Sequence, residues 1–308
     1  MVLLLQPLFG SADSWRRLLN TAMPEIEARI WPEIGNLADI ELAAVWALPP
    51  GTLAKLPNLR LIVSLTAGTD ALLRDPDLPS VPIIRAGDTT GDAMMNETTL
   101  LHVLRHHRYM PDYLQAQQRC EWIRLPVKAA SERKVGVMGL GMIGLAAAKM
   151  LVSVGFQVAG WVRHPRPCTE IEIFSGREHL NAFLARSEIL VNLLPLTSET
   201  RGIINAEMLN ELPAGAAIIN LGRGDHVVES DFISALDPGH LAATTLDVFP
   251  VEPLPSDSPL WRHPKITVMP HVARRLVPEE LAPRICAIIK QLYAGTPFTQ
   301  VVDRKLGY

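Results

Sequence analysis

The sequence predicts an α/β protein made of two doubly wound parallel-sheet domains, Rossmann-like or flavodoxin-like, with a cleft between them. Short apolar runs alternate with stretches of helical spacing, and this alternation starts afresh at Lys134. The length of 308 residues suits two domains. A glycine-rich turn at 139–144 joins a strand to a helix. We expect one domain of residues 1–97 and 279–308, and a second domain of residues 98–278 that carries this turn.

The individual elements follow from apolar runs, helical spacing and the Pro and Gly residues that interrupt them. In the first half we predict strands at 2–6, 43–47, 59–65 and 81–85 and a helix at 14–23. A helix over 94–109 ends before Pro111, and residues 111–132 are expected to be irregular. In the second half we predict strands at 134–138, 156–161, 189–194, 216–221, 242–247 and 266–269, and helices at 142–154 and 278–293.

Composition excludes several classes of partner. The net charge of −3 gives no basic surface for nucleic acid, and no apolar run approaches the roughly 20 residues of a membrane span. The apolar stretch Met1–Phe9 has the character of a first strand, not of a signal peptide. Cys120, Cys168 and Cys286 are scattered and odd in number, which favours a reducing cytoplasm over disulfides and offers no metal site.

The turn at 139–144 has the spacing of a dinucleotide-binding loop and the right context, since a strand precedes it and an Ala-rich helix follows. Gly139 permits the tight turn, Gly141 lets a pyrophosphate approach the backbone, and Gly144 lets the helix pack on the strand. The start of the helix offers N–H groups to phosphates. The predicted cofactor-binding residues here are Gly139, Gly141, Met142, Ile143 and Gly144.

The strand that follows this helix bears on the choice between NAD and NADP. An acidic residue about 20 positions after the glycines would bind the ribose 2′-hydroxyl of NAD. The sequence has no acid there and places Arg163 where a 2′-phosphate would lie. We therefore predict that NADP(H) is preferred over NAD(H), the alternative being that Arg163 is a solvated loop residue.

Three later segments deliver ionisable groups to predicted strand ends, where ligands bind in doubly wound sheets. They carry Arg223 between two glycines, Glu252 before a proline, and His271 after Met269-Pro270. Each has an ordinary structural explanation: a loop ion pair, a turn residue or a packed histidine. Their shared position at strand ends makes a common catalytic site the stronger interpretation.

With these segments in order, the chain resembles the D-isomer-specific 2-hydroxyacid dehydrogenase family, and within it the reductases of glyoxylate and hydroxypyruvate. The resemblance spans nearly the whole chain. It also includes Ala67-Gly68, Asn192-Leu-Leu-Pro195, Glu252-Pro-Leu-Pro255 and the C-terminal 302–308. It implies an NADPH-dependent reduction of a small 2-keto acid, hydride coming from the nicotinamide. A non-catalytic NAD(P)-binding sensor on the same fold is the alternative.

The resemblance implies a role for each of the three ionisable residues, and their chemistry agrees. Arg223 would hold the substrate carboxylate and polarise the keto oxygen. His271 would give a proton to that oxygen. Glu252 would bind the other ring nitrogen and favour the protonated imidazole.

The resemblance also implies a wider set of contacts. Residues Ala67, Gly68 and Thr69 would bind the substrate carboxylate, with Trp46 as a pocket wall or, alternatively, a core residue. Residues Leu194, Pro195, Leu221 and Gly222 would border the cofactor. Asp247 would contact the nicotinamide carboxamide, with a turn cap as the competing interpretation. The helix at 94–109 resembles the family's dimer-forming helix, so a homodimer is expected.

Two departures from the family pattern bear on substrate choice. Thr66 stands where the carboxylate-binding loop usually has glycine, and Arg274-Arg275 replaces small apolar residues after the catalytic histidine. The added cations favour a more anionic substrate or simply face solvent. The two-domain organisation predicts closure over the substrate, with hinges near 92–97 and 273–283.

Overall fold

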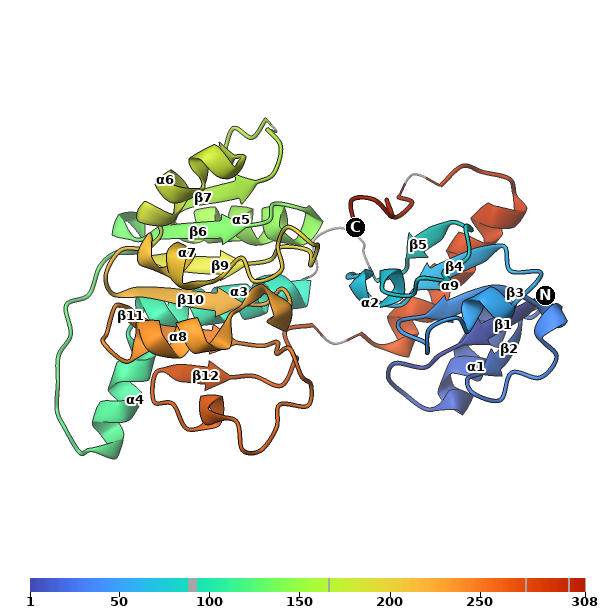
Figure 1. The fold of residues 1–308 in the computed structure, drawn as a ribbon, viewed down its shortest axis with the longest axis horizontal. Coiled ribbons are helices and arrows are strands. Elements are labelled where there is room, and N and C mark those ends of the chain that lie inside the picture. The colour runs from blue at the N-terminus through green and yellow to red at the C-terminus, as the bar shows by residue number, and fades with distance from the viewer. Residues whose placement is uncertain (88–92, 166, 275, 299, 308) are drawn as a thin grey trace. The chain divides into compact units, whose positions relative to one another are not determined.

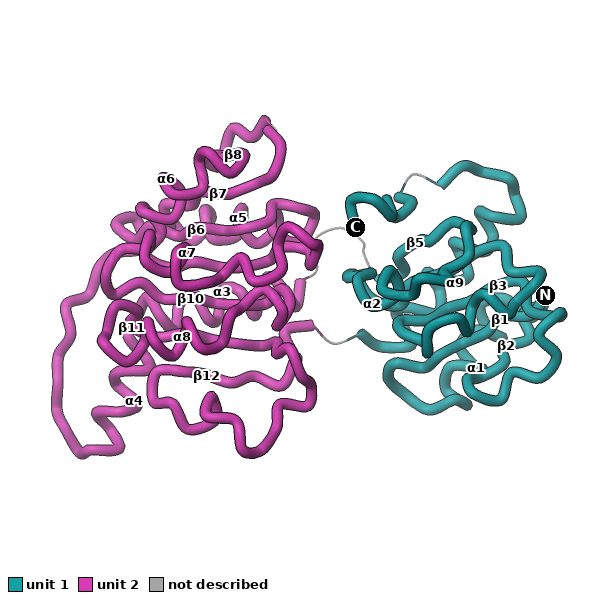
Figure 2. The backbone as a smooth tube through the Cα atoms, viewed as in Figure 1, with its two compact units in different colours: residues 1–89, 275–308 teal, residues 90–274 magenta. Residues whose placement is uncertain are grey.

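The computed structural model describes residues 1–87, 93–165, 167–274, 276–298 and 300–307. The chain divides into two compact units, one of residues 1–89 and 275–308 and the other of residues 90–274 (Figure 2). Each unit has its own sheet and its own core (Figure 1). We call them unit 1 and unit 2.

The sheet of unit 1 has five parallel strands in the order β2-β1-β3-β4-β5. This is the flavodoxin-like order, in which the crossover direction reverses beside β1. The strands are β1 (Val2–Leu5), β2 (Glu27–Ile30), β3 (Ile40–Val45), β4 (Leu61–Ser64) and β5 (Ile83–Arg85). The inner strands β3 and β4 are almost wholly buried, as their continuous apolar sequence requires.

Two apolar clusters sandwich this sheet. On one face, α1 (Ala12–Ala22) packs against α9 (Pro278–Tyr293), with Trp15, Leu19 and Ile285 fully buried. The other face is covered by α2 (Asp70–Leu73) and the 3₁₀ turns η1 (Leu37–Asp39) and η2 (Leu53–Lys55). The last long helix of the chain therefore completes the core of the first unit (Figure 1).

The sheet of unit 2 has seven parallel strands in the order β12-β11-β10-β9-β6-β7-β8. The crossover direction reverses between β6 and β9, which is where a doubly wound sheet binds its ligand. The strands are β6 (Lys134–Met138), β7 (Gln157–Val162), β8 (Glu172–Ser175), β9 (Ile189–Asn192), β10 (Ala216–Asn220), β11 (Leu241–Leu246) and β12 (Ile266–Val268).

Helices cover both faces of this second sheet. One cluster joins α3 (Ala93–His107) and α5 (Met142–Val154) to the sheet, and another joins α6 (Leu180–Ala185), α7 (Ala206–Asn210) and α8 (Glu229–Leu236) to the opposite face (Figure 1). The remaining elements are α4 (Met110–Gln118), η3 (Ala130–Glu132), η4 (Arg177–His179), η5 (Gly224–His226) and η6 (Pro259–Trp261). The two parallel sheets with helices on both faces confirm the predicted α/β fold.

Besides the short helices α2, α6, α7 and α8, which were not predicted, the observed elements differ from the predicted ones at α4 and at two edge strands. Residues 111–132 were expected to be irregular, which is wrong for α4, because Pro111 lies in the first turn of that helix, where a missing N–H costs no hydrogen bond. Two edge strands, β2 and β8, were also not predicted. Both are short and begin with a glutamate, so neither shows the apolar run that marks an inner strand.

Within the described residues, none of the helices combines the length and the apolar character that a bilayer crossing requires.

Candidate active site

The glycine turn lies at the carboxyl end of β6 and leads into α5. Gly139 has a φ of 87°, and a Cβ there would lie 2.8 Å from the carbonyl oxygen of Leu193. A Cβ at Gly144 would lie 1.8 Å from the carbonyl oxygen of Gly139. The turn and the start of the helix therefore pack too closely for any side chain at these two positions.

Gly141 differs from its two partners because the space around it is open. A Cβ added there would meet no atom of the described residues within 4 Å. Gly141 is exposed and is the N-cap of α5, a helix of 13 residues, but it has no side chain with which to cap it. The first turn of α5, with Met142 exposed and Ile143 half-buried, thus offers its N-terminal dipole and an unobstructed backbone. These features fit the pyrophosphate of a dinucleotide.

The residues predicted to border the cofactor follow the two strands next to this turn. Leu194 is buried after β9, and its Cα would lie 3.0 Å from a Cβ at Gly139. Pro195 is half-buried beside it. Leu221 and Gly222 follow β10 and are both buried. The structure thus places them at the carboxyl ends of β9 and β10.

Arg163 directly follows β7, next to the glycine turn in the sheet order. Its guanidinium forms an ion pair with the carboxylate of Glu199, in the loop after β9. The side chain of Arg163 is 30% exposed and that of Glu199 is 63% exposed. Because the carboxylate of Glu199 is mostly exposed, water weakens the ion pair, and Arg163 can exchange this carboxylate for another anion.

The side chains of Glu252 and His271 form a hydrogen-bonded pair. The Nδ1 atom of His271 lies 2.7 Å from Oε2 of Glu252, and Oε1 of Glu252 accepts the N–H of Phe249 at 2.9 Å. A carboxylate only accepts hydrogen bonds, so Nδ1 carries a hydrogen and Nε2 is the nitrogen available for proton exchange. His271 has a φ of 53°, a left-handed conformation that is uncommon outside glycine and clusters at functional sites.

This pairing sets the protonation of both groups. The hydrogen bond to Glu252 raises the pKa of His271, against the opposing effect of burial, and the negative charge of Glu252 adds to the rise. For Glu252, burial favours the neutral carboxyl, but hydrogen bonds from His271 and Phe249 and the charges of His271 and Arg223 outweigh it. The pKa of Glu252 is therefore lowered. The pair favours a carboxylate beside an imidazolium.

Arg223 belongs to the same site. It lies in the loop between β10 and η5, and its Nη1 donates to the carbonyl oxygen of Gly222 at 2.8 Å. Its positive charge lowers the pKa of both His271 and Glu252. A Cβ at Gly224 would lie 1.9 Å from the carbonyl carbon of Phe249. The loop carrying Arg223 thus packs against the segment that leads to Glu252.

Asp247 follows β11 and is almost fully buried. Its two carboxylate oxygens accept the N–H groups of Val272 and Ala273 at 2.8 and 2.9 Å. Burial raises its pKa, against these two hydrogen bonds. In the structure Asp247 therefore fixes the backbone that follows His271, which matches the capping alternative; the carboxamide contact stays a prediction.

Three buried polar residues beside Arg223 were not expected to act in the site. The amides of Asn192 and Asn220, at the ends of β9 and β10, bond to one another, and the ring of His226 bonds to Asn192 and to the N–H of Arg223. All three side chains belong to residues with no exposed surface. The two asparagines could have been noticed in the sequence, because each is a polar residue at the end of an apolar strand.

The predicted substrate-side residues lie in unit 1, at the carboxyl ends of its strands. Trp46 follows β3 and is 37% exposed, which favours a surface position over the core. Ala67, Gly68 and Thr69 follow β4; Thr69 is buried, and its Oγ1 has no hydrogen-bond partner among the described residues. The hydroxyl of Thr66 donates to the carbonyl oxygen of Gly68 at 2.7 Å, so this departure from the family pattern shapes the loop.

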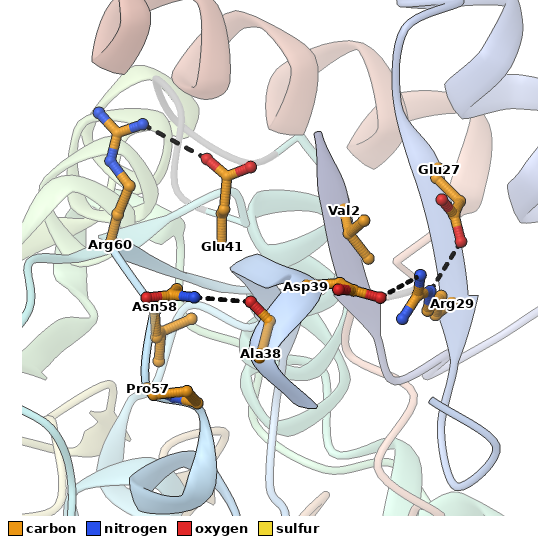
Figure 3. Close-up of a pocket in the computed structure, with 10 residues that line it drawn as sticks. Val2, Glu27, Arg29, Ala38, Asp39, Glu41, Pro57, Asn58 and Arg60 are labelled. Atoms are coloured by element: carbon orange, nitrogen blue, oxygen red, sulfur yellow. Dashed lines mark hydrogen bonds and ion pairs between the residues drawn. The ribbon is translucent and has the colours of Figure 1, made fainter. Parts of the chain in front are cut away.

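A charged depression at the opposite, amino-terminal edge of the unit 1 sheet is shown in Figure 3. Its cations are neutralised locally, since Arg29 pairs with Glu27 and Asp39, and Arg60 pairs with Glu41. Ligands of doubly wound sheets bind at the carboxyl edge, so this depression is not a candidate for the active site.

Some predicted positions fall partly outside the described residues. Arg275 and the start of the hinge at 92–97 lie outside them, whereas Arg274 is half-buried at the edge of unit 2. Among the described residues, no group of three or more His, Cys, Asp or Glu side chains is arranged to hold a metal ion.

Comparison with known proteins shows the family to which the chain is similar. Residues 100–273 match the model of the D-isomer specific 2-hydroxyacid dehydrogenase, NAD binding domain. The chain is 39% identical over 306 residues to glyoxylate/hydroxypyruvate reductase A of Serratia proteamaculans, covering 97% of each chain.

Two solved structures are similar over essentially their whole length. A D-isomer specific 2-hydroxyacid dehydrogenase from Xanthobacter autotrophicus Py2, in complex with NADPH and MES, is 42% identical with a TM-score of 0.92 and covers 100% of this chain and 99% of its own. An NADPH-dependent glyoxylate/hydroxypyruvate reductase from Sinorhizobium meliloti, in complex with NADP and sulfate, is 34% identical with a TM-score of 0.92, covering 100% of both chains. This chain therefore belongs to the D-isomer-specific 2-hydroxyacid dehydrogenase family.

Proposed function

We propose that the protein reduces small 2-keto acids of the glyoxylate and hydroxypyruvate type to their 2-hydroxy acids with NADPH. The observation that carries this proposal is the hydrogen-bonded Glu252–His271 pair beside Arg223, which presents a proton donor and a cation in one place. The full-length similarity to reductases of glyoxylate and hydroxypyruvate supports the same substrate class.

The site residues divide the chemistry between them. When bound, the nicotinamide cofactor supplies the hydride. Arg223 binds the substrate carboxylate and draws electron density toward the keto oxygen. His271, protonated because Glu252 raises its pKa, gives the Nε2 proton to that oxygen as the hydroxyl forms. Glu252 remains a carboxylate throughout and holds the ring in position.

The preference for NADPH rests on Arg163. A 2′-phosphate is a dianion, and a guanidinium binds it with charge-assisted hydrogen bonds. In the structure Arg163 is already paired with one carboxylate, that of Glu199. We infer that the phosphate takes the place of Glu199, because it carries more charge and more acceptor oxygens than the carboxylate.

The substrate-side contacts are assigned to unit 1. We propose that Ala67, Gly68 and Thr69 bind the substrate carboxylate, that Trp46 forms a pocket wall, and that the two domains close over the substrate. We also propose that the protein is a cytoplasmic homodimer. Its three cysteines are free thiols, which suits a reducing compartment, and α3 exposes apolar side chains that suit an interface.

Steady-state kinetics test the proposed reaction. NADPH and NADH are each tested with glyoxylate, hydroxypyruvate, pyruvate and a dicarboxylic keto acid. The proposal expects turnover with the first two and a higher kcat/KM with NADPH. A preference for the dicarboxylate would assign Arg274 or Arg275 to the substrate site. Tight NADPH binding without turnover on any keto acid would contradict the proposal and favour a sensor.

A further inference from the structure

His226 is a fully buried histidine three positions after Arg223, at the end of η5. It touches two parts of the candidate site through different ring nitrogens. Nδ1 lies 3.1 Å from the main-chain nitrogen of Arg223, and Nε2 lies 3.3 Å from the carbonyl oxygen of Pro195. The loop that carries Arg223 and the loop that carries Pro195 therefore meet at one imidazole ring.

The neighbouring amides fix which ring nitrogen accepts. A main-chain N–H can only donate. The main-chain nitrogen of Leu194 lies 3.2 Å from Oδ1 of Asn192, so this atom is the acceptor. The Nδ2 group of Asn192 is then the donor to Asn220, at 2.9 Å, and to Nδ1 of His226, at 2.9 Å. The orientation of Asn192 thus follows from the hydrogen bonds.

These contacts define the protonation state of the ring. Nδ1 of His226 faces two donors, the N–H of Arg223 and the amide of Asn192, so it carries no hydrogen. The ring is then a neutral imidazole with its hydrogen on Nε2, which donates to the carbonyl oxygen of Pro195. Thr200 donates to the same carbonyl at 2.7 Å, so the Pro195 loop is held from two sides.

The packing around the ring leaves little room for rearrangement. A Cβ at Gly222 would lie 3.0 Å from Nδ1 of His226 and 3.0 Å from Nδ2 of Asn192. The glycine before Arg223 therefore lets the loop lie directly over the contact between these two side chains. On the other side of Arg223, its carbonyl oxygen accepts from Nδ2 of Asn220 at 3.0 Å. Both main-chain polar groups of Arg223 are thus bound to buried side chains.

We propose that His226 is a positioning residue that couples the two halves of the site: its Nδ1 holds the backbone of Arg223 for the substrate carboxylate, and its Nε2–H holds the Pro195 loop for the nicotinamide cofactor. This inference rests on the proposed function, because it takes Arg223 as the carboxylate-binding residue. It gives His226 no contact with the reacting atoms, so His226 is not a catalytic residue.

Two near-isosteric variants separate the two contacts. An asparagine carries its carboxamide as far from Cα as Nδ1, and a glutamine carries its amide nitrogen as far as Nε2. His226→Asn therefore keeps an acceptor for Arg223 and loses the contact to Pro195. His226→Gln keeps a donor for Pro195 and loses the acceptor for Arg223. Each lost hydrogen bond is expected to change one affinity by about tenfold.

The readouts are equilibrium titrations that need no turnover. NADPH is titrated by fluorescence, and oxamate, an unreactive keto-acid analogue, is titrated into the protein saturated with NADPH. We expect His226→Asn to weaken NADPH binding about tenfold with little effect on oxamate, and His226→Gln to do the reverse. His226→Ala should weaken both.

The matched control is His240, whose Nε2 contacts the carbonyl oxygen of Leu209 at 2.9 Å next to the start of β11. His240→Ala loses a similar contact and should leave both affinities unchanged. Equal losses of both affinities in His226→Asn and His226→Gln, or no loss in either, would overturn the role of His226. Absence of glyoxylate reduction by the wild type contradicts the proposed function instead, and the NADPH titrations still test the contact to Pro195.

Discussion

At the scale of single residues, the proposed proton transfer depends on how Glu252 sets the protonation of His271. The hydrogen bond between them raises the pKa of the imidazole, and Arg223 opposes this rise through its own positive charge. A reduction needs the protonated ring, because the keto oxygen must receive a proton. The activity of the reductive reaction should thus fall as the pH rises through the pKa of His271.

Replacing Glu252 tests this dependence directly. Glu252→Gln removes the negative charge and the carboxylate acceptor, so the pKa of His271 falls and less imidazolium is present near neutral pH. We expect kcat/KM for reduction to drop by about tenfold or more, and the alkaline limb of its pH profile to move to lower pH. A profile that kept its wild-type midpoint would show that Glu252 does not control the proton donor.

Arg163 is the residue proposed to favour NADPH over NADH. Arg163→Ala should raise the KM for NADPH by about tenfold to 100-fold and leave that for NADH nearly unchanged, since only NADPH carries the 2′-phosphate. Glu199→Gln removes the competing carboxylate and should lower the KM for NADPH. Arg16→Ala, which breaks an exposed ion pair with Asp13 in α1, is the matched control and should change neither constant. Equal effects of Arg163→Ala on both cofactors would contradict the assignment.

The proposed catalytic residues were predictable from the sequence to the extent that they follow strand ends. Arg223, Glu252 and His271 each follow a predicted strand. In the structure Glu252 and His271 are hydrogen-bonded, and the loop that carries Arg223 packs against the segment that leads to Glu252. His226 could not be found in this way, because it lies in η5 and its neighbours Arg223 and Pro195 belong to loops that follow two different strands. Only the contacts of the folded chain identify it.

At the scale of elements, the turn between β6 and α5 shows three glycines with different tasks. Two are needed for close packing, while Gly141 faces open space. The bounds of α5 were predicted from helical spacing and the flanking glycines, and they agree with the structure. The edge strand β8 and the short helix α4 were not predicted, because short exposed elements carry little apolar pattern.

Alanine at two of these glycines separates folding from binding. Gly144→Ala forces a methyl group onto the Gly139 carbonyl and should cost about 1–3 kcal/mol of unfolding free energy, measured by urea denaturation. Gly141→Ala should change stability by no more than about 0.5 kcal/mol, yet its methyl group occupies the space expected for the pyrophosphate. We therefore expect NADPH affinity to fall about tenfold. A Gly141→Ala protein that binds NADPH normally would place the phosphates elsewhere.

At the scale of the whole molecule, the proposed homodimer gives a use to apolar residues that water would otherwise contact. Leu101 is 59% exposed and Leu104 is 36% exposed on α3. These side chains cost free energy in contact with water, and burying them between two copies removes that cost. The dimer was inferred from the family resemblance, since one sequence carries no information on which exposed residues meet a partner.

Charged residues on this face test the dimer. Leu101→Glu combined with Leu104→Glu should shift the protein from dimer to monomer in analytical ultracentrifugation, because burying two unpaired carboxylates opposes association. Val154→Glu, at an exposed apolar position at the end of α5, serves as the control and should remain dimeric. A wild-type protein that sediments as a monomer at all concentrations would contradict the proposed dimer.

Arg223 and His271 are the two residues that, in the proposed function, make this fold a 2-keto acid reductase. The most direct test of this function is the rate of NADPH oxidation on addition of glyoxylate, measured for the wild type, Arg223→Ala and His271→Ala. We predict glyoxylate-dependent turnover by the wild type and a loss of at least about 100-fold in either variant, with NADPH binding retained. A wild type that binds NADPH but oxidises none of it with glyoxylate, hydroxypyruvate or pyruvate would contradict this function.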